Sequence, residues 1–238
     1  MKRRICALLA LVLAGLLAGC ASGAAPKELT TDQLAIRMVL KELTEEDAEL
    51  YAARLSEMSE DDFDNFVAKI MKASDKDTDW TLVQKNFAHL GAEMDLPECS
   101  TEEESEFFVL RSFSIALPEQ QHLYFHLYST WYESQGMGTD LITLRFDPEK
   151  LKLRSCYTSD DIAAVADSTG EGEVSFSYED RRASDPAPFD GDDRNGEVLV
   201  AIRMEPLADG EAAHSATLKH DGSKEMFEIT VEDTVALF

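Results

Sequence analysis

The first half of the chain repeats hydrophobic residues at spacings of three and four, which is the period of an amphipathic α-helix. Between residues 30 and 95 this pattern divides into four segments, and residues such as Thr44 and Ser59 stand where a helix cap is expected. The stripes expected to face inward are Ile36, Val39, Leu40 and Leu43; Ala48, Tyr51, Leu55 and Met58; Phe63, Phe66, Val67, Ile70 and Met71; and Trp80, Val83, Phe87 and Leu90. Short loops favour antiparallel neighbours, so residues 30–95 predict a small helical bundle.

From residue 107 onward, hydrophobic and polar residues alternate, which is the period of a β-strand with one buried face. The turn at 147–150 and the pair Asp221–Gly222 are typical of tight connections between antiparallel strands. The expected strands cover 107–117, 122–132, 141–146, 151–157, 174–178, 198–204, 212–219 and 225–231. Residues 100–238 therefore predict an antiparallel β-sheet domain of about eight strands, interrupted by a short helix at 159–167 and a polar loop at 179–196. The whole chain is expected to be α+β.

The N-terminal segment has a different pattern. Lys2, Arg3 and Arg4 precede an apolar run over residues 5–18. As a helix this run would reach roughly 21 Å, which is short of the ~30 Å hydrocarbon core of a bilayer. A basic start, a short apolar run and small residues at a cleavage point are typical of an export signal peptide.

The sequence Leu-Ala-Gly-Cys at 17–20 resembles the lipobox of bacterial lipoprotein signal peptides. The resemblance implies that residues 1–19 are removed and that the thiol of Cys20 takes a lipid, with palmitate or a similar acyl chain on the new N-terminus. Residues 20–29 would be a flexible tether. In lipoproteins of diderm bacteria, an Asp after the lipid-bearing cysteine usually keeps the protein in the inner membrane. Here that position holds Ala21, so the resemblance implies the periplasmic face of the outer membrane in a diderm host. In a host with one membrane it implies the outer face of the cell membrane. The alternative is a cleaved secretory signal with an incidental cysteine.

Loss of residues 1–19 leaves 19 basic residues against 47 acidic ones, a net charge of −28. Such a charge repels nucleic acid and anionic lipid head groups, and no basic stripe interrupts it. Nucleic acid is therefore excluded as a partner. The hydrophobic content, 44% of all residues, is that of a globular protein and not of a disordered acidic tail.

Two cysteines remain in the body of the chain after the signal segment and the lipid site are set aside. In an oxidising compartment outside the cytoplasm, two such thiols tend to pair. We therefore expect a disulfide between Cys99 and Cys156. The alternative is two separate buried thiols.

The expected strand at 122–132 is aromatic or apolar on both faces, which an ordinary solvent-facing strand is not. One face could stack a sugar ring or line an apolar pocket. The residues of this candidate ligand-binding face are His122, Tyr124, His126, Tyr128 and Tyr132. Its two histidines lie about 13 Å apart along the strand, so they cannot share a metal ion by themselves. The alternative is a central strand with the other sheet on one face and the helical bundle on the other.

Asp75, Asp77 and Asp79 alternate with other residues, as the oxygen ligands of a calcium loop do. The sixth and twelfth places of an EF-hand loop require Gly and Glu, and here they hold Trp80 and Asn86. Calcium is the one cofactor that the sequence suggests. The alternative is an acidic loop in which Asp79 caps the fourth helix.

None of the short motifs for hydrolysis, phosphate binding or dithiol chemistry is present in the sequence. The sequence therefore favours a lipid-anchored cell-envelope lipoprotein that acts as a non-catalytic binding or assembly module. Its partner would be another envelope protein or a small apolar or glycan ligand. The alternative is a hydrolase of envelope polymers, with carboxylates and His122 or His126 as acid and base, because folding can assemble catalytic groups from distant positions.

Overall fold

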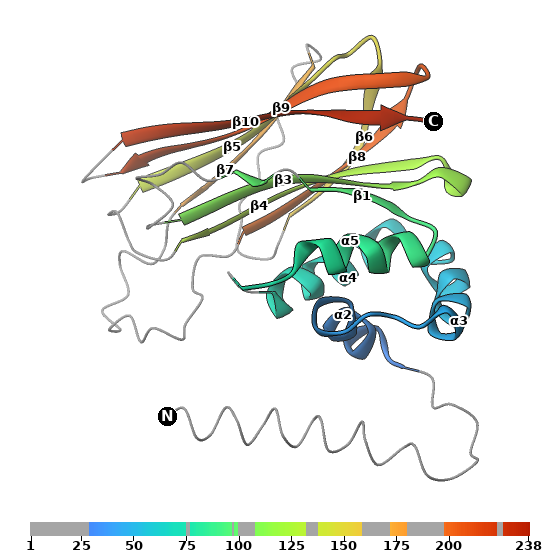
Figure 1. Cartoon of the computed structure of the whole chain (residues 1–238). Coiled ribbons are helices and arrows are strands. Elements are labelled where there is room, and N and C mark those ends of the chain that lie inside the picture. Colours follow the sequence, from blue (N-terminus) through green and yellow to red (C-terminus); the bar gives the residue numbers. More distant parts are fainter. Residues whose placement is uncertain are drawn as a thin grey trace, which may run out of the picture. The chain divides into compact units, whose positions relative to one another are not determined.

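The computed structural model describes residues 29–74, 77–96, 98–99, 108–131, 138–158, 172–179, 198–222 and 226–238. Helices come first along this part of the chain and strands follow, in Thr31–Phe238, which forms one compact unit separate from Met1–Thr30. The helices are α2 (Thr31–Leu40), α3 (Glu45–Ser56), α4 (Glu60–Ala73) and α5 (Trp80–His89) (Figure 1).

Three of these helices begin at a side chain that accepts a main-chain hydrogen bond. Thr44 caps α3, Ser59 caps α4 and Asp79 caps α5, with oxygen to nitrogen distances of 3.1, 3.2 and 3.1 Å. The first turns of α3 and α4 each carry three acidic residues, which favour the positive end of the helix dipole. Helix starts are therefore local features of this sequence.

Helix α2 is rotated relative to the expectation from its hydrophobic stripe. Ile36 and Leu40 were expected to face inward, but they are 40% and 63% exposed. Leu34 and Met38 are completely buried instead. Both pairs recur at a spacing of four, so periodicity alone does not choose between two adjacent faces. The choice is made by packing, because α2 contacts α4 and α5 through the buried face.

The strands form two antiparallel sheets. They are β1 (Glu93–Asp95), β2 (Glu98–Cys99), β3 (Phe108–Leu117), β4 (His122–Trp131), β5 (Gly138–Phe146), β6 (Leu151–Thr158), β7 (Glu173–Glu179), β8 (Val198–Pro206), β9 (Gly210–Gly222) and β10 (Met226–Leu237). Sheet A has the order β1-β3-β4-β8-β6, with β2 also paired to β3, and sheet B has the order β10-β9-β5-β7. A short 3₁₀ turn, Pro118–Gln120, joins β3 to β4, and the hairpin that joins β9 to β10 pairs twelve residues of each strand.

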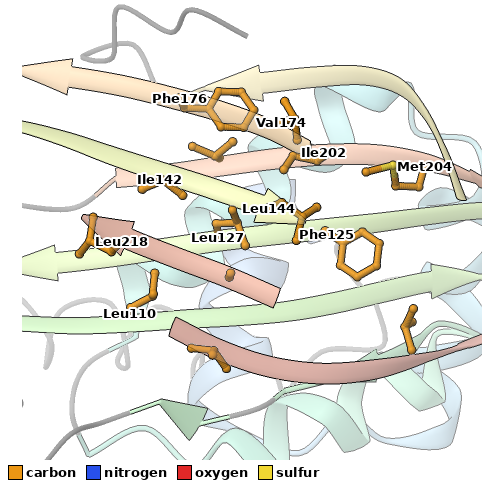
Figure 2. Close-up of a cluster of buried hydrophobic side chains, with 14 of the residues drawn as sticks. Leu110, Phe125, Leu127, Ile142, Leu144, Val174, Phe176, Ile202, Met204 and Leu218 are labelled. Carbon is orange, nitrogen blue, oxygen red and sulfur yellow. The ribbon is translucent and has the colours of Figure 1, made fainter. Parts of the chain in front are cut away.

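The main hydrophobic core lies between the two sheets. Alternate residues of strands such as β4, β7 and β8 point into it, as the period of a strand requires. Figure 2 shows side chains from β4, β5, β7, β8 and β9 meeting in this space, among them Phe125, Ile142, Phe176, Ile202 and Leu218. Sheet A and sheet B are thus the two layers of a β-sandwich.

The helices cover the opposite face of sheet A. The ring of Phe63 in α4 lies 4.7 Å from the ring of Tyr124 in β4. Glu60, in the first turn of α4, forms an ion pair with Arg203 of β8. The indole ring of Trp80 in α5 lies 4.4 Å from the guanidinium carbon of Arg111 in β3. The compact unit is therefore built in three layers: helices, sheet A and sheet B.

The structure confirms helices followed by antiparallel strands, and so the α+β expectation at this level. A bundle with a core of its own is not confirmed, because the buried faces of the helices also pack against sheet A. The short strands β1 and β2 were not expected. The helix expected at 159–167 lies outside the described residues, and so does the loop expected at 179–196 apart from Glu179, the last residue of β7. None of the helices in the described ranges is long and apolar enough to cross a bilayer.

The rotation of α2 gives a matched test. Leu34→Ala is expected to lower the free energy of unfolding by about 2–5 kcal/mol, because it leaves a cavity in a packed site. Leu40→Ala, the same truncation on the exposed side of the helix, is expected to change it by less than about 0.5 kcal/mol. Urea unfolding followed by circular dichroism measures both. Equal losses would contradict the assigned faces of α2.

Candidate functional site

The aromatic face of β4 is buried. Tyr124, His126 and Tyr128 point towards the helices and none of them is more than 5% exposed. The Tyr124 hydroxyl and His122 Nδ1 share a hydrogen bond of 3.3 Å. Burial, helped by the charge of Asp64, raises the pKa of Tyr124, and burial lowers the pKa of His122.

His126 is the centre of this buried layer. Its side chain is 0% exposed, its ring stacks on Phe113 with ring centres 5.2 Å apart, and its Nε2 lies 3.3 Å from the accepting Oδ1 of Asp64 in α4. The expectation of an open ligand-binding face is therefore wrong for Tyr124, His126 and Tyr128, because the helices cover it. His126 has no path to a polymer substrate in this structure. Tyr132 lies outside the described residues.

Asp79, the last residue of the suggested calcium loop, accepts a hydrogen bond from the main-chain nitrogen of Leu82. It therefore acts as the N-cap of α5, which was the alternative interpretation. Asp75 lies outside the described residues. Within the described ranges, no three His, Cys, Asp or Glu side chains are grouped so that they could hold a metal ion.

The expected disulfide does not form in this fold. Cys156 in β6 has a free thiol at the protein surface. Cys99 is in β2, and β3, β4 and β8 lie between that strand and β6. Four strand spacings amount to about 19 Å, whereas bridged Cα atoms lie within about 7 Å. The order of strands, which the sequence does not reveal, overturns the expected pair.

Two polar pairs lie inside the sandwich. Asp140 Oδ1 of β5 lies 2.5 Å from His220 Nδ1 of β9, and the two residues are direct cross-strand neighbours. The hydroxyl groups of Ser129 and Tyr178 lie 3.3 Å apart and connect sheet A to sheet B. Both pairs satisfy polar groups that are buried within the core, and this is the arrangement of structural hydrogen bonds.

The flank of the sandwich beside β10 is different, because sheet A extends further than sheet B. Strand β10 is the last strand of sheet B, and it approaches β3 across the sandwich. Strand β1 lies one position beyond β3, where sheet B has no described strand. Glu93 and Asp95 of β1 pair with Ala116 and Ser114, so their side chains are on the face of sheet A that looks towards sheet B. Both are exposed.

A third carboxylate, Asp233, points inward from β10, at the same parity as the core residues Val231 and Val235. We call Glu93, Asp95 and Asp233 the carboxylate notch. Burial raises the pKa of Asp95, and the charge of Asp233 raises it further. The two carboxylates are thus close enough to repel each other across the flank.

His214 of β9 lies behind the notch, directly opposite Asp233 in the hairpin. It is 6% exposed, and its ring centre lies 4.6 Å from that of Phe125. Neither ring nitrogen has a hydrogen-bond partner among the described residues. Burial lowers the pKa of His214, and the charges of Asp233 and Asp95 oppose that effect. The imidazole is therefore held neutral next to two acidic groups.

The outer face of sheet B has a hollow of about 660 Å³ beside the same edge. Its lining residues are Arg145, Phe146, Asp147, Ala213, His214, Ser215, Glu232, Asp233 and Thr234. Arg145 is already neutralised by Glu173, with nitrogen and oxygen 2.7 Å apart. Glu232, opposite Ser215, forms no ion pair with any described residue. Asp147 and Asp233 of the lining are likewise in no ion pair with a described residue, so the hollow has three carboxylates available for a cation.

Together, the notch, the hollow and the free edge of β10 form the candidate functional site. Chemically, this surface offers carboxylates to a cation and an unpaired strand edge to a peptide. This site was not expected from the sequence, because the last expected strand ended at residue 231 and left out Glu232 and Asp233. The alternation of Thr230, Glu232 and Thr234 with Val231 and Val235 is the signal that could have extended that strand.

Comparison with known proteins gives no family for this chain. No family model matches it, and no curated protein matches it. Among solved structures, a type I cohesin of Pseudobacteroides cellulosolvens is 16% identical, with 49% of this chain and 82% of that chain covered and a TM-score of 0.35. The cohesin module of a family 33 glycoside hydrolase from Clostridium perfringens is 10% identical, with coverage of 48% and 84% and a TM-score of 0.35.

The GAE domain of GGA2p from Saccharomyces cerevisiae overlaps to a similar degree. It is 9% identical, with 61% of this chain and 100% of that chain covered and a TM-score of 0.34. Likenesses of this size define neither the family nor the function of this chain.

The burial of His214 predicts a pH dependence of stability. Because its folded pKa is lowered, the unfolded chain binds the proton more readily, and the free energy of unfolding should fall as the pH falls through about 6.5. A single group of this kind changes the free energy of unfolding by at most about 1.4 kcal/mol per pH unit. His122 acts in the same direction, so His214→Asn should flatten the dependence between pH 7.5 and 5.5 without removing it.

The control for this prediction is His89→Asn in the last turn of α5, which should keep the wild-type slope. Urea midpoints between pH 7.5 and 5.5 measure all three proteins. The raised pKa of Asp95 acts with the opposite sign, because there the folded chain binds the proton more readily than the unfolded chain does. A wild-type slope in His214→Asn would contradict the assignment.

The role of Asp79 can be tested with two substitutions. Asp79→Ala should lower the free energy of unfolding by about 0.5–2 kcal/mol, whereas Asp79→Ser should keep nearly all of it, because serine also caps a helix. Serine lacks the carboxylate that a calcium site needs. Thermal unfolding with calcium and with chelator measures the difference. A calcium-dependent loss in both variants would favour the metal site over the cap.

Proposed function

We propose that this chain is a lipid-anchored protein of the bacterial cell envelope, whose folded unit is a non-catalytic binding or assembly module. The binding part is carried by one observation, the open flank where sheet A extends beyond β10. The anchoring part is supported by the resemblance of residues 17–20 to a lipobox. The proposed location is the periplasmic face of the outer membrane in a diderm host, and otherwise the outer face of the cell membrane.

The tether places the folded unit close to the membrane. Ten residues, 21–30, separate Cys20 from the first residue of α2, and ten extended residues span at most about 35 Å. Two or three acyl chains give firm anchoring, at ~0.8 kcal/mol per buried methylene. The net charge of −28 repels anionic head groups, so the folded unit would remain in the aqueous phase and face other envelope components.

A protein partner is favoured over a small apolar or glycan ligand. The aromatic side chains that could have stacked a sugar, Tyr124 and Tyr128, are covered by the helices. The surface that remains available carries carboxylates and main-chain groups at a strand edge. Such groups bind peptide segments and basic side chains, and they offer little to an apolar ligand.

The lipid anchor can be tested by metabolic labelling in the native host with an alkyne analogue of palmitate. The wild-type protein should be labelled and should partition into the detergent phase, whereas Cys20→Ala should show neither property. Cys156→Ala is the matched control, because it removes the exposed thiol of β6 and should keep full labelling. Equal labelling of Cys20→Ala and wild type would overturn the anchor.

A further inference from the structure

We infer that the free edge of β10 binds an extended basic segment of a partner protein, which adds to sheet B as a fifth strand and covers β1. This inference rests on the proposed function and specifies its partner surface. Three observations support it: the length and regularity of β10 compared with the other edge strands, the unequal width of the two sheets, and the negative charge of the flank.

Strand β10 is protected at its edge by charge, through Glu232 and the inward-pointing Asp233, which oppose pairing only with strands of like charge. It has none of the other protective features of a sheet edge, which are short length, a proline and a bulge. Of the other edges, β1 and β2 have three and two residues, β6 is irregular between Leu153 and Ser155, and β7 has seven residues. Strand β10 pairs with β9 over twelve consecutive residues without a shift in register. No described strand pairs with its other edge.

The unequal width of the sheets provides room for one more strand. A strand added to β10 would lie about 4.8 Å from it, and sandwich layers are about 10 Å apart. Because β10 faces β3, the added strand would be placed over β1, which follows β3 in sheet A. It would cover Glu93 and Asp95, whose side chains look towards sheet B and are exposed.

The negative charge of the flank determines which kind of peptide can bind to β10. Side chains on the inner face of an added strand would meet the carboxylate notch, in which Asp95 and Asp233 already repel each other. Side chains on its outer face would lie beside Glu232, at the rim of the hollow. A segment with Lys or Arg on both faces relieves this repulsion with one set of side chains and meets Glu232 with the other. A second copy of the chain does not, because it would bring Glu232 and Asp233 against carboxylates of the same kind.

His214 adds an independent sign that the flank is incomplete. A neutral imidazole offers one donor and one acceptor, and at 6% exposure neither nitrogen of His214 has a partner in the described part of the chain. Buried polar groups are normally hydrogen-bonded. A Lys or Arg side chain that enters the notch to reach Asp233 would also be able to donate to the acceptor nitrogen of His214, its cross-strand neighbour.

The probe for this inference is a synthetic peptide with blocked ends, Thr-Lys-Lys-Val-Thr-Lys-Lys-Val-Thr, which carries Lys on both faces of an extended strand. Its control has Glu in place of each Lys. Binding is measured by fluorescence anisotropy at 50 mM salt, with the mature chain carrying Cys20→Ala so that it stays in solution. The basic peptide should bind and the acidic one should not. Amide hydrogen exchange should slow in β10 and leave the helices unchanged.

Two substitutions in the site and one outside it separate this surface from the general acidity of the chain. Asp95→Asn and Glu232→Gln should each weaken binding of the basic peptide about two- to fivefold, as expected for loss of one cross-strand charge pair. The double reversal Asp95→Lys with Glu232→Lys should abolish it. Glu46→Gln, an exposed carboxylate on α3, should have no effect. Urea midpoints confirm that each variant is folded.

Strand addition is tested with N-methylated forms of the basic peptide, because alternate main-chain amides of an added strand face β10. Methylation of one alternate set should abolish binding and methylation of the other should leave it. Equal binding of both forms, or binding that survives the double reversal, would overturn the inference and leave a binding module with another surface. A dimer in sedimentation that the double reversal dissociates would make a second copy the occupant and also overturn it.

Absence of binding by wild type would overturn the inference as well. The lipid anchor would be unaffected by that result, because labelling at Cys20 decides it separately. The proposed function and the assigned partner surface can therefore fail independently.

Discussion

The burial of sheet A on both faces is the constraint on which the rest of this structure depends. Its inner face meets sheet B at Phe125 and Leu127, and its other face meets α4 at Tyr124 and His126. A strand covered on both sides must carry large apolar groups at every position, which explains the unusual composition of β4. The polar groups on the helix side are acceptable because they find partners such as Asp64. The same contacts make the helices part of one compact unit.

Much of this arrangement could be predicted from local pattern. The caps Thr44 and Ser59 mark the starts of two helices, and the alternation of Val174, Phe176 and Tyr178 marks a strand whose residues enter the core. These features depend on residues close together in the chain. The helix stripe was correct in α4, where only one apolar face exists. In the first helix it was correct for Val39 and Leu43 and wrong for Ile36 and Leu40, because two adjacent faces compete there.

The site could not be predicted, because it depends on strand order and on the relative width of two sheets. Asp95 and Asp233 are far apart in the sequence and meet only because β1 and β10 lie on the same flank. The same limitation produced the incorrect Cys99–Cys156 pair, whose strands are far apart within one sheet. For β4 the sequence left two interpretations, an open aromatic face or a central strand between the other sheet and the helices, and the contacts of α4 with Tyr124 and His126 bear out the second. Spacing within a segment is thus informative, whereas proximity between segments depends on topology.

The carboxylates of the flank have two effects with one electrostatic cause: they repel other copies of the chain and they attract a basic partner. A long regular edge strand invites pairing between copies of a protein, and a lipid anchor would increase that risk by concentrating the copies on one surface. Glu232 and Asp233 oppose such pairing, because each copy presents like charges to the other. A basic segment meets the same edge without that cost and relieves the repulsion between Asp95 and Asp233. The charge that keeps anchored copies apart would therefore also determine which partner is admitted.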